Sequence, residues 1–301
     1  MSRKVKTWLI VAVSLIVIGC LIFVGVMTML KWNFNKLSTS KYQIKEYEIT
    51  ENFEDIFIQT DTANIEFVLS DNENISVKCY EKEKESHKVE VKENTLSIEK
   101  MDNRKWYEYI GINFSTPKIT VSIPKGEYGN LLIKTSTGKV NITKDFKFKD
   151  VEISLSTGDI KVENLTAKTI ALSTTTGKIA TTNVVCEEEL SINVSTGKTY
   201  LENITCNSLI SNGNTGDIFL ENVIVAGKME IKRSTGDIKF DGCDAGEIYI
   251  KTSTGSVKGK FKTGKVFIVN TDTGRKEVPN TITGGKCEIT TNTGDIIITI
   301  N

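Results

Sequence analysis

His87 is the only histidine in the 301-residue chain, so it is the first residue to test for acid–base or nucleophilic chemistry. Such chemistry needs a nucleophile or a second carboxylate within hydrogen-bond reach of the imidazole. The sequence places no Cys, Ser or carboxylate with His87 in a recognisable constellation. The Lys- and Glu-rich run 81–94 around it predicts a solvated hairpin. We therefore expect a non-enzymatic protein with no catalytic residues.

Metal and phosphate sites are the next candidates. An aspartate just after a repeated glycine is typical of calcium-binding solenoids that carry Gly-Gly-x-Gly-x-Asp. Here the doubled glycine is missing. The position after the repeated glycine also carries both charges: Asp159, Asp217, Asp237 and Asp295, but Lys139, Lys178, Lys198 and Arg275. Charge pairing between neighbouring coils on a solvated corner explains this better, each pair contributing less than about 1 kcal/mol. Segment 259–265 imitates a phosphate-binding loop but lacks the following Ser/Thr and helix. We expect no metal and no cofactor.

Cys186 and Cys206 form a candidate stacked pair, because each lies nine residues after a repeated glycine. Residues at one offset of a repeat stack in adjacent coils, within the Cα separation that a disulfide needs. Other coils hold small apolar residues there, such as Ala167 and Val225. Because free cysteine is among the most buried residue types, two reduced core cysteines are favoured over a disulfide.

Nine Thr-Gly pairs, always 19 or 20 residues apart, organise the last two-thirds of the chain, with glycines at Gly138, Gly158, Gly177, Gly197, Gly216, Gly236, Gly255, Gly274 and Gly294. So short a period predicts stacked coils, because each unit buries its apolar face only against its neighbours. Apolar residues alternate at period two on both sides of each glycine, which predicts two strands joined at a corner with positive φ. The fold class is therefore all-β: a single-stranded parallel β-solenoid of 19–20-residue coils.

Two further sets of residues recur at fixed offsets from the repeated glycine. Six residues after the glycine, a second, left-handed corner is predicted by Asn164, Asn183, Asn203, Asn222 and Gly242. The threonines of the Thr-x-Thr-Gly motifs face inward or lie at the corner, which predicts a structural ladder of hydroxyls.

The N-terminus predicts one transmembrane helix. Residues 8–30 form an uncharged, apolar signal-anchor long enough to span a bilayer. Arg3, Lys4 and Lys6 favour a cytoplasmic segment 1–7 and an exported body. A linker 31–44, degenerate N-terminal coils and a cap over 45–130, and the regular Thr-Gly solenoid 131–301 complete the predicted organisation.

Val17-Ile18-Gly19-Cys20 resembles a bacterial lipobox, whose cysteine would be acylated and whose preceding segment would be removed. Residues 21–30 stay apolar, where a lipoprotein normally turns polar, so the uncleaved anchor is favoured. Both alternatives hold the body at the outer face of a membrane.

The two ends of the solenoid carry the candidate contact surfaces. Segment 101–114 lacks the two-residue alternation and contains Trp106, Tyr107, Tyr109 and Phe114, which either cap the first coil or form a partner-binding patch. At the other end, Ile296–Ile300 predicts an uncovered apolar edge strand and hence end-on association with another copy or another protein.

Several segments together resemble a known family. Asp61-Thr62-Ala63-Asn64-Ile65-Glu66, then Ile119-Thr120-Val121-Ser122-Ile123-Pro124, lead into Ser-Thr-Gly-Asp-Ile at 156–160 and 234–238. From about residue 45 to the end, the chain resembles the bacterial putative-adhesin family called domain of unknown function 4097, the β-strand-repeat proteins. The resemblance implies an extracytoplasmic bacterial β-solenoid, with some members associated with cell-envelope stress operons. It implies no catalytic residues.

Charge and composition narrow the function. Without Arg3, Lys4 and Lys6, 35 basic residues face 38 acidic ones, which disfavours a nucleic-acid partner. We expect a membrane-anchored interaction module at the bacterial cell membrane, binding a protein or an envelope polymer. The alternative is a carbohydrate-binding or polysaccharide-acting β-helix, which predicts carboxylates and aromatics aligned over several coils. Between Gly138 and Gly294 the sequence has scattered Lys and Glu and few aromatics.

Overall fold

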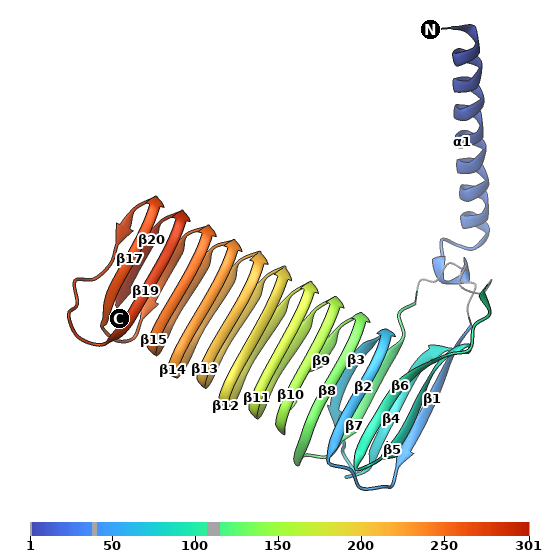
Figure 1. Ribbon diagram of the computed structural model, residues 1–301. Coiled ribbons are helices and arrows are strands. Elements are labelled where there is room, and N and C mark those ends of the chain that lie inside the picture. Colours follow the sequence, from blue (N-terminus) through green and yellow to red (C-terminus); the bar gives the residue numbers. More distant parts are fainter. Residues whose placement is uncertain (1, 38–40, 107–114, 301) are drawn as a thin grey trace.

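The computed structural model describes residues 2–37, 41–106 and 115–300, and it forms a long β-solenoid with one helix at its N-terminal end (Figure 1). The elements in chain order are α1 (Arg3–Met29), η1 (Phe34–Leu37), β1 (Tyr42–Ile49), β2 (Asp55–Thr62), β3 (Asn64–Leu69), β4 (Ile75–Lys82), β5 (Glu85–Lys92), β6 (Thr95–Asp102), β7 (Lys118–Ile123), β8 (Glu127–Thr137), β9 (Val140–Ile142), β10 (Phe146–Thr157), β11 (Ile160–Thr176), β12 (Ile179–Thr196), β13 (Thr199–Thr215), β14 (Ile218–Thr235), β15 (Ile238–Thr254), β16 (Val257–Phe261), β17 (Lys265–Thr273), β18 (Lys276–Glu277), β19 (Gly285–Thr293) and β20 (Ile296–Ile300).

Helix α1 has 27 residues, which span about 40 Å at 1.5 Å per residue. Its C-terminal end is set by Lys31 and Trp32, whose φ angles are 52° and 56°, and the Trp32 N–H donates to the Met27 carbonyl at 2.8 Å. The helix is long and apolar enough to cross a membrane. Met27 is its only buried residue, so its apolar surface is not covered by the described part of the chain.

The solenoid is a parallel stack with one continuous core, as the repeat predicts. Equivalent apolar residues lie directly opposite one another on β11, β12 and β13, as Ile170, Leu190 and Leu209 do. Buried apolar side chains form one cluster that extends from Ile56 to Ile298. Each coil therefore supplies a slice of core that only its neighbours can cover.

The Thr-Gly corner requires glycine for two separate reasons. The nine repeated glycines have φ angles between 129° and 154°, a region that residues with a Cβ rarely adopt. Coils also approach closely here, since a Cβ on Gly158 would lie 1.6 Å from the Gly138 carbonyl oxygen. The predicted hydroxyl ladder is confirmed, because inward threonines donate to glycine carbonyls of an adjacent coil: Thr174 to Gly158 at 3.1 Å and Thr291 to Gly255 at 3.0 Å.

The asparagine corner is also confirmed. Asn164, Asn183, Asn203 and Asn222 have φ angles of 52–55°, and Gly242 continues the column at 60°. Their side chains form an amide ladder in which each Nδ2 donates to the Oδ1 of the preceding asparagine at 3.0, 3.0 and 2.9 Å. Asparagine thus satisfies both the left-handed backbone and the exposed corner.

The N-terminal end combines coils with antiparallel strands. Strands β2 and β3 pair in parallel with β8 and β9, and β6 and β7 extend the stack by pairing with β2 and β3. Beyond them, β5 pairs with β6, β4 with β7 and β1 with β4, all antiparallel. We call β1, β4 and β5 the cap. Its antiparallel pairing was not predicted, because residues 45–130 lack the Thr-Gly marker.

The last two coils are not stacked in chain order. Strand β19 lies between β15 and β17, and β20 pairs with β16 along Ile296–Ile300 and with β18 at Ile296 and Ile297 (Figure 1). The predicted open edge is therefore covered at Ile296 and Ile297, whereas Ile298–Ile300 pair with β16 alone. End-on association through this strand stays a prediction. Strand β19 buries Cys287 and Ile289 fully, whereas Val266 and Ile268 of β17 are 40% and 52% exposed. The difference reflects the side of the strand, because Val266 and Ile268 face outward opposite Lys286 and Glu288, whereas Cys287 and Ile289 face the core.

Candidate functional site

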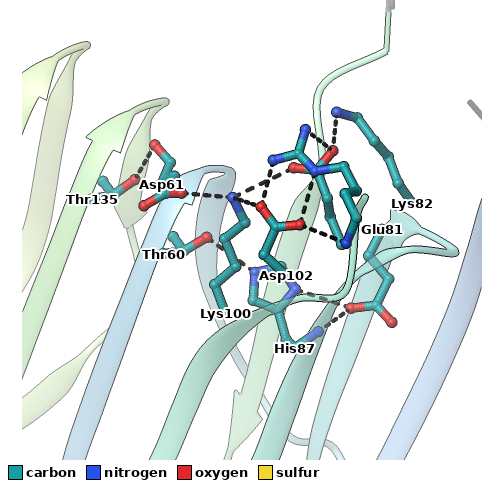
Figure 2. Close-up of polar contacts among 10 residues, drawn as sticks. Thr60, Asp61, Glu81, Lys82, His87, Lys100, Asp102 and Thr135 are labelled. Carbon is teal, nitrogen blue, oxygen red and sulfur yellow. Dashed lines mark hydrogen bonds and ion pairs between the residues drawn. The ribbon is translucent and has the colours of Figure 1, made fainter. Parts of the chain in front are cut away.

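A polar cavity of about 440 Å³ lies where the cap meets the first coil (Figure 2). We call it the cap cavity. Strands β2, β4, β5 and β6 and the connection between β6 and β7 supply its lining residues: Thr60, Asp61, Thr62, Lys82, Glu85, His87, Lys100, Arg104, Ser115, Thr116 and Pro117. Antiparallel cap strands thus bring together residues up to 57 positions apart, from Thr60 to Pro117.

Ion pairs connect the charged residues of this site (Figure 2). Lys100 Nζ lies 2.6 Å from an Asp61 carboxylate oxygen and 3.4 Å from Glu85. Arg104 pairs with Glu85 at 3.0 Å and with Asp102 at 2.6 Å, and Lys82 pairs with Glu85 at 2.5 Å. Three cations therefore face three carboxylates, so the network carries little net charge. A ligand would meet both positively and negatively charged groups there.

The pKa shifts follow from these pairs. The hydrogen bond from the Arg104 guanidinium holds the pKa of the Asp102 carboxyl well below its usual range. Burial alone would lower the pKa of Lys100, but the hydrogen bond to Asp61 outweighs it and the pKa is raised. Both groups are charged at neutral pH.

Two of the lining residues, Thr60 and His87, belong to a polar group whose side chains come from β1, β2, β4 and β5. His87 Nδ1 lies 3.0 Å from Glu81 Oε2, and His87 Nε2 lies 3.0 Å from Thr60 Oγ1. Glu81 Oε1 contacts Lys45 Nζ at 3.1 Å. Since the carboxylate only accepts, Nδ1 carries the proton, and Nε2 accepts from the Thr60 hydroxyl. Burial lowers the pKa of His87, which keeps the imidazole neutral.

The expectation of a solvated hairpin around His87 is wrong in its exposure. Strands β4 and β5 do form a hairpin, but Glu81 and His87 are 0% and 5% exposed. A carboxylate and a thiol do lie with the imidazole, since ligand atoms of Cys79, Glu81 and His87 all lie within 4.8 Å of one another. The missed signal was the alternation Val77, Cys79, Glu81, which points all three residues inward along β4.

The order carboxylate, imidazole, hydroxyl is that of a nucleophilic triad. Thr60, however, lies directly opposite Thr135 and is 4% exposed. It is therefore the last inward threonine of the hydroxyl ladder, and His87 gives it the partner that a glycine carbonyl gives in other coils. This contact closes the ladder at the end of the solenoid.

The family model described as Toastrack DUF4097 matches residues 53–299. The chain belongs to the Toastrack DUF4097 family. Among solved structures, a "putative adhesin" from Bacteroides fragilis is 18% identical, covering 87% of this chain and 97% of that one with a TM-score of 0.40. A "putative adhesin" from Parabacteroides merdae is 12% identical, covering 73% and 97% with a TM-score of 0.40. A "putative lipid binding protein" from Parabacteroides distasonis is 14% identical, covering 88% and 98% with a TM-score of 0.37. No curated protein sequence matches the chain.

Of the four aromatic residues in the predicted patch of this Toastrack chain, the structure describes Trp106. Trp106 is 80% exposed and follows Arg104 by two residues on the connection that lines the cavity. Tyr107, Tyr109 and Phe114 lie outside the described residues. Strands β4 and β5 provide cover for the first coils, which is one of the two roles foreseen for these aromatics.

The stacked cysteines of the Toastrack rod lie where the repeat places them. Cys186 and Cys206 are directly opposite on β12 and β13, both buried and both free thiols. Burial raises the pKa of Cys186 to about 11 and that of Cys206 to about 12. The reduced form is the one in the structure.

The aspartates that follow the repeated glycines accept hydrogen bonds at the corners of the Toastrack coils. Asp159 accepts a hydrogen bond from the Lys178 backbone N–H at 3.0 Å, and Asp237 accepts one from Ser256 at 2.9 Å. Side chains pair across coils as predicted, with Lys198 3.4 Å from Asp217. These aspartates thus accept hydrogen bonds from backbone N–H groups of the neighbouring coil.

One outer face of the Toastrack rod aligns aromatics and carboxylates more closely than the sequence suggested. A groove of about 260 Å³ over β13–β15 is lined in part by Tyr200, Phe219, Glu202, Glu221 and Asp241. The two rings stack on each other, with centroids 5.0 Å apart and an interplanar angle of 7°. Lys178 lies over the Tyr200 ring, and Lys198 and Lys239 over the Phe219 ring, at 5.5–6.0 Å from the centroids.

Proposed function

We propose that this Toastrack chain is a membrane-anchored, extracytoplasmic and non-enzymatic adhesin-like module that binds a protein or an envelope polymer. The observation that carries the proposal is α1, a 27-residue apolar helix left uncovered by the described rest of the chain. An uncovered apolar surface of this size needs a bilayer around it. Arg3, Lys4 and Lys6 favour a cytoplasmic N-terminus, which would leave the rod outside.

The cap cavity and Trp106 are the proposed contact surface. The cavity offers cations and carboxylates together, and Trp106 adds a large apolar side chain on the same connection. Aromatic and Arg side chains are enriched among residues that dominate binding energy. A role in envelope-stress sensing belongs to the proposal too and rests on the family resemblance alone.

A binding assay on the full chain in detergent micelles tests the proposed surface. The chain is mixed with purified bacterial envelope fragments, and the fraction that sediments with them is measured for wild type, Trp106→Ala and Tyr200→Ala. Removing an aromatic anchor typically costs about 1–2 kcal/mol, so we expect binding to weaken by about tenfold in Trp106→Ala. Tyr200→Ala, a half-exposed aromatic on the rod, should bind as wild type does. Equal binding by all three proteins would contradict the assignment to the cap.

The rod face over β13–β15 is the observation that favours the polysaccharide alternative. Sugars bind aromatics by lying flat on an open ring face. Tyr200 and Phe219 instead cover one another and are flanked by lysines, which leaves mainly their edges toward solvent. The cap is therefore the better-supported contact surface.

A further inference from the structure

We propose that Cys79, Glu81 and His87 form a buried binding site for one divalent transition-metal ion, Zn²⁺ by their chemistry. Cys79 and Glu81 lie two residues apart on the inward side of β4, and His87 faces them from β5. Their ligand atoms lie within 4.8 Å of one another, and all three residues are buried. This inference is independent of the proposed partner binding.

The donor set selects the metal. Thiolate sulfur and imidazole nitrogen favour Zn²⁺ over Mg²⁺ or Ca²⁺, which prefer oxygen ligands. In a tetrahedral zinc site, bonds of about 2.0–2.3 Å separate the ligand atoms by roughly 3.3–3.6 Å. His87 Nδ1 and Glu81 Oε2 are 3.0 Å apart, so they need to separate only slightly. The Cys79 sulfur lies within 4.8 Å of the other two ligand atoms, so it must approach them by up to about 1.5 Å. Three protein ligands leave the fourth position to water.

Charges and protons balance on binding. Without a metal, Glu81 pairs with Lys45 while Cys79 is a neutral thiol, because burial raises its pKa to about 12. With Zn²⁺, a Zn–S bond replaces the S–H bond and one proton leaves to solvent. A Zn–N bond replaces Nδ1–H, and the imidazole takes its proton at Nε2 instead. The thiolate and carboxylate then neutralise the ion.

The surrounding contacts suit a ligating histidine. Once metallated at Nδ1, His87 donates its Nε2–H to Thr60 Oγ1, which already lies 3.0 Å away. The His87 backbone N–H donates to Glu81 Oε2 at 2.6 Å and so orients the carboxylate. The Lys45 side chain is 40% exposed, so it can turn toward water and open a path to Glu81. The metal would join β4 to β5 and stabilise the cap.

Cobalt(II) is the probe, because a thiolate bound to Co²⁺ gives a charge-transfer absorption that oxygen and nitrogen ligands do not give. The full chain in detergent micelles is stripped with chelator and titrated with Co²⁺. We expect one equivalent to bind with this absorption, and Zn²⁺ to displace it. Cys79→Ser should abolish the absorption, whereas Cys287→Ser, which removes another buried thiol, should leave it unchanged. Glu81→Gln should weaken Co²⁺ binding at least tenfold.

Two results would overturn the proposal: no thiolate absorption in the wild-type chain, or the same absorption in a folded Cys79→Ser chain. Should Cys79→Ser fail to fold, X-ray absorption of the wild-type zinc complex decides instead. One sulfur together with nitrogen and oxygen neighbours supports the site, and a shell of oxygen and nitrogen alone rejects it.

Discussion

At the scale of single residues, the repeated glycines are the positions that the fold tolerates least. Gly197 combines a φ of 146° with a backbone oxygen 1.7 Å from where a Cβ would stand. Strained backbone and overpacking each cost about 1–3 kcal/mol. We therefore expect Gly197→Ala to lower the free energy of unfolding by roughly 3 kcal/mol or more, measured by urea titration. Lys198→Ala, on the exposed neighbour, is the control; it removes only an exposed ion pair and a ring contact and should change the free energy of unfolding by less than about 1 kcal/mol. Similar values for both variants would contradict this account of the corner.

The buried thiols make a second prediction at this scale. Burial raises the pKa of Cys206 and Cys287 to about 12, whereas Cys20 is exposed. Only the thiolate reacts with alkylating reagents, so at pH 8 the buried thiols should stay unmodified in the folded chain and react after denaturation. Mass spectrometry after iodoacetamide treatment measures this in detergent micelles. Rapid native modification of Cys206 would show that the coils open more readily than the structure implies.

Residue-level prediction succeeded where a backbone conformation or a hydrogen bond required one particular residue type. Glycine and asparagine at the corners, and threonine in the ladder, were readable because each recurs at a fixed offset. Glu81 and His87 were misjudged because charged residues are usually solvated and their burial depends on antiparallel partners far along the chain. Lys45 and Thr60, which contact them, come from β1 and β2.

At the scale of elements, the decisive departure from the sequence is the order of the last coils. Period and offsets specify that coils stack, but every coil presents a similar edge, so they do not specify which coil stacks on which. The connection 278–284 lets the chain turn back, and the coil of β19 and β20 enters between its predecessors.

Cross-linking tests this order. Thr290 lies directly opposite both Lys251 of β15 and Asn270 of β17. Paired cysteines in adjacent coils lie about 4.8 Å apart, within disulfide range, whereas residues two coils apart are separated by about 10 Å. We expect Lys251→Cys/Thr290→Cys to form a disulfide on mild oxidation and Lys251→Cys/Asn270→Cys to form none, judged by peptide mapping. The reverse pattern would restore chain-order stacking.

At the scale of the whole molecule, a stiff rod is joined at its cap to a helix that suits a bilayer (Figure 1). This arrangement would place the cap cavity, with its charged lining and Trp106, near the membrane surface, and the far coils of β17 and β18 away from it. The sequence was sufficient for the rod and for the apolar N-terminal helix, because the rod has a periodic signal and the helix a compositional one. The cavity depends on how β4, β5 and β6 fold back against the first coils. This part of the sequence has no repeat from which that arrangement could be predicted.

Thiol labelling in intact bacterial cells tests the anchored, outward-facing rod most directly. Full-length chains carrying Cys20→Ser together with either Ser156→Cys, on the exposed rod, or Ser2→Cys, before α1, are treated with a membrane-impermeant maleimide. We predict that Ser156→Cys is labelled in intact cells and that Ser2→Cys is labelled only after permeabilisation. Labelling of Ser2→Cys in intact cells, with Ser156→Cys protected until permeabilisation, would contradict an extracytoplasmic rod.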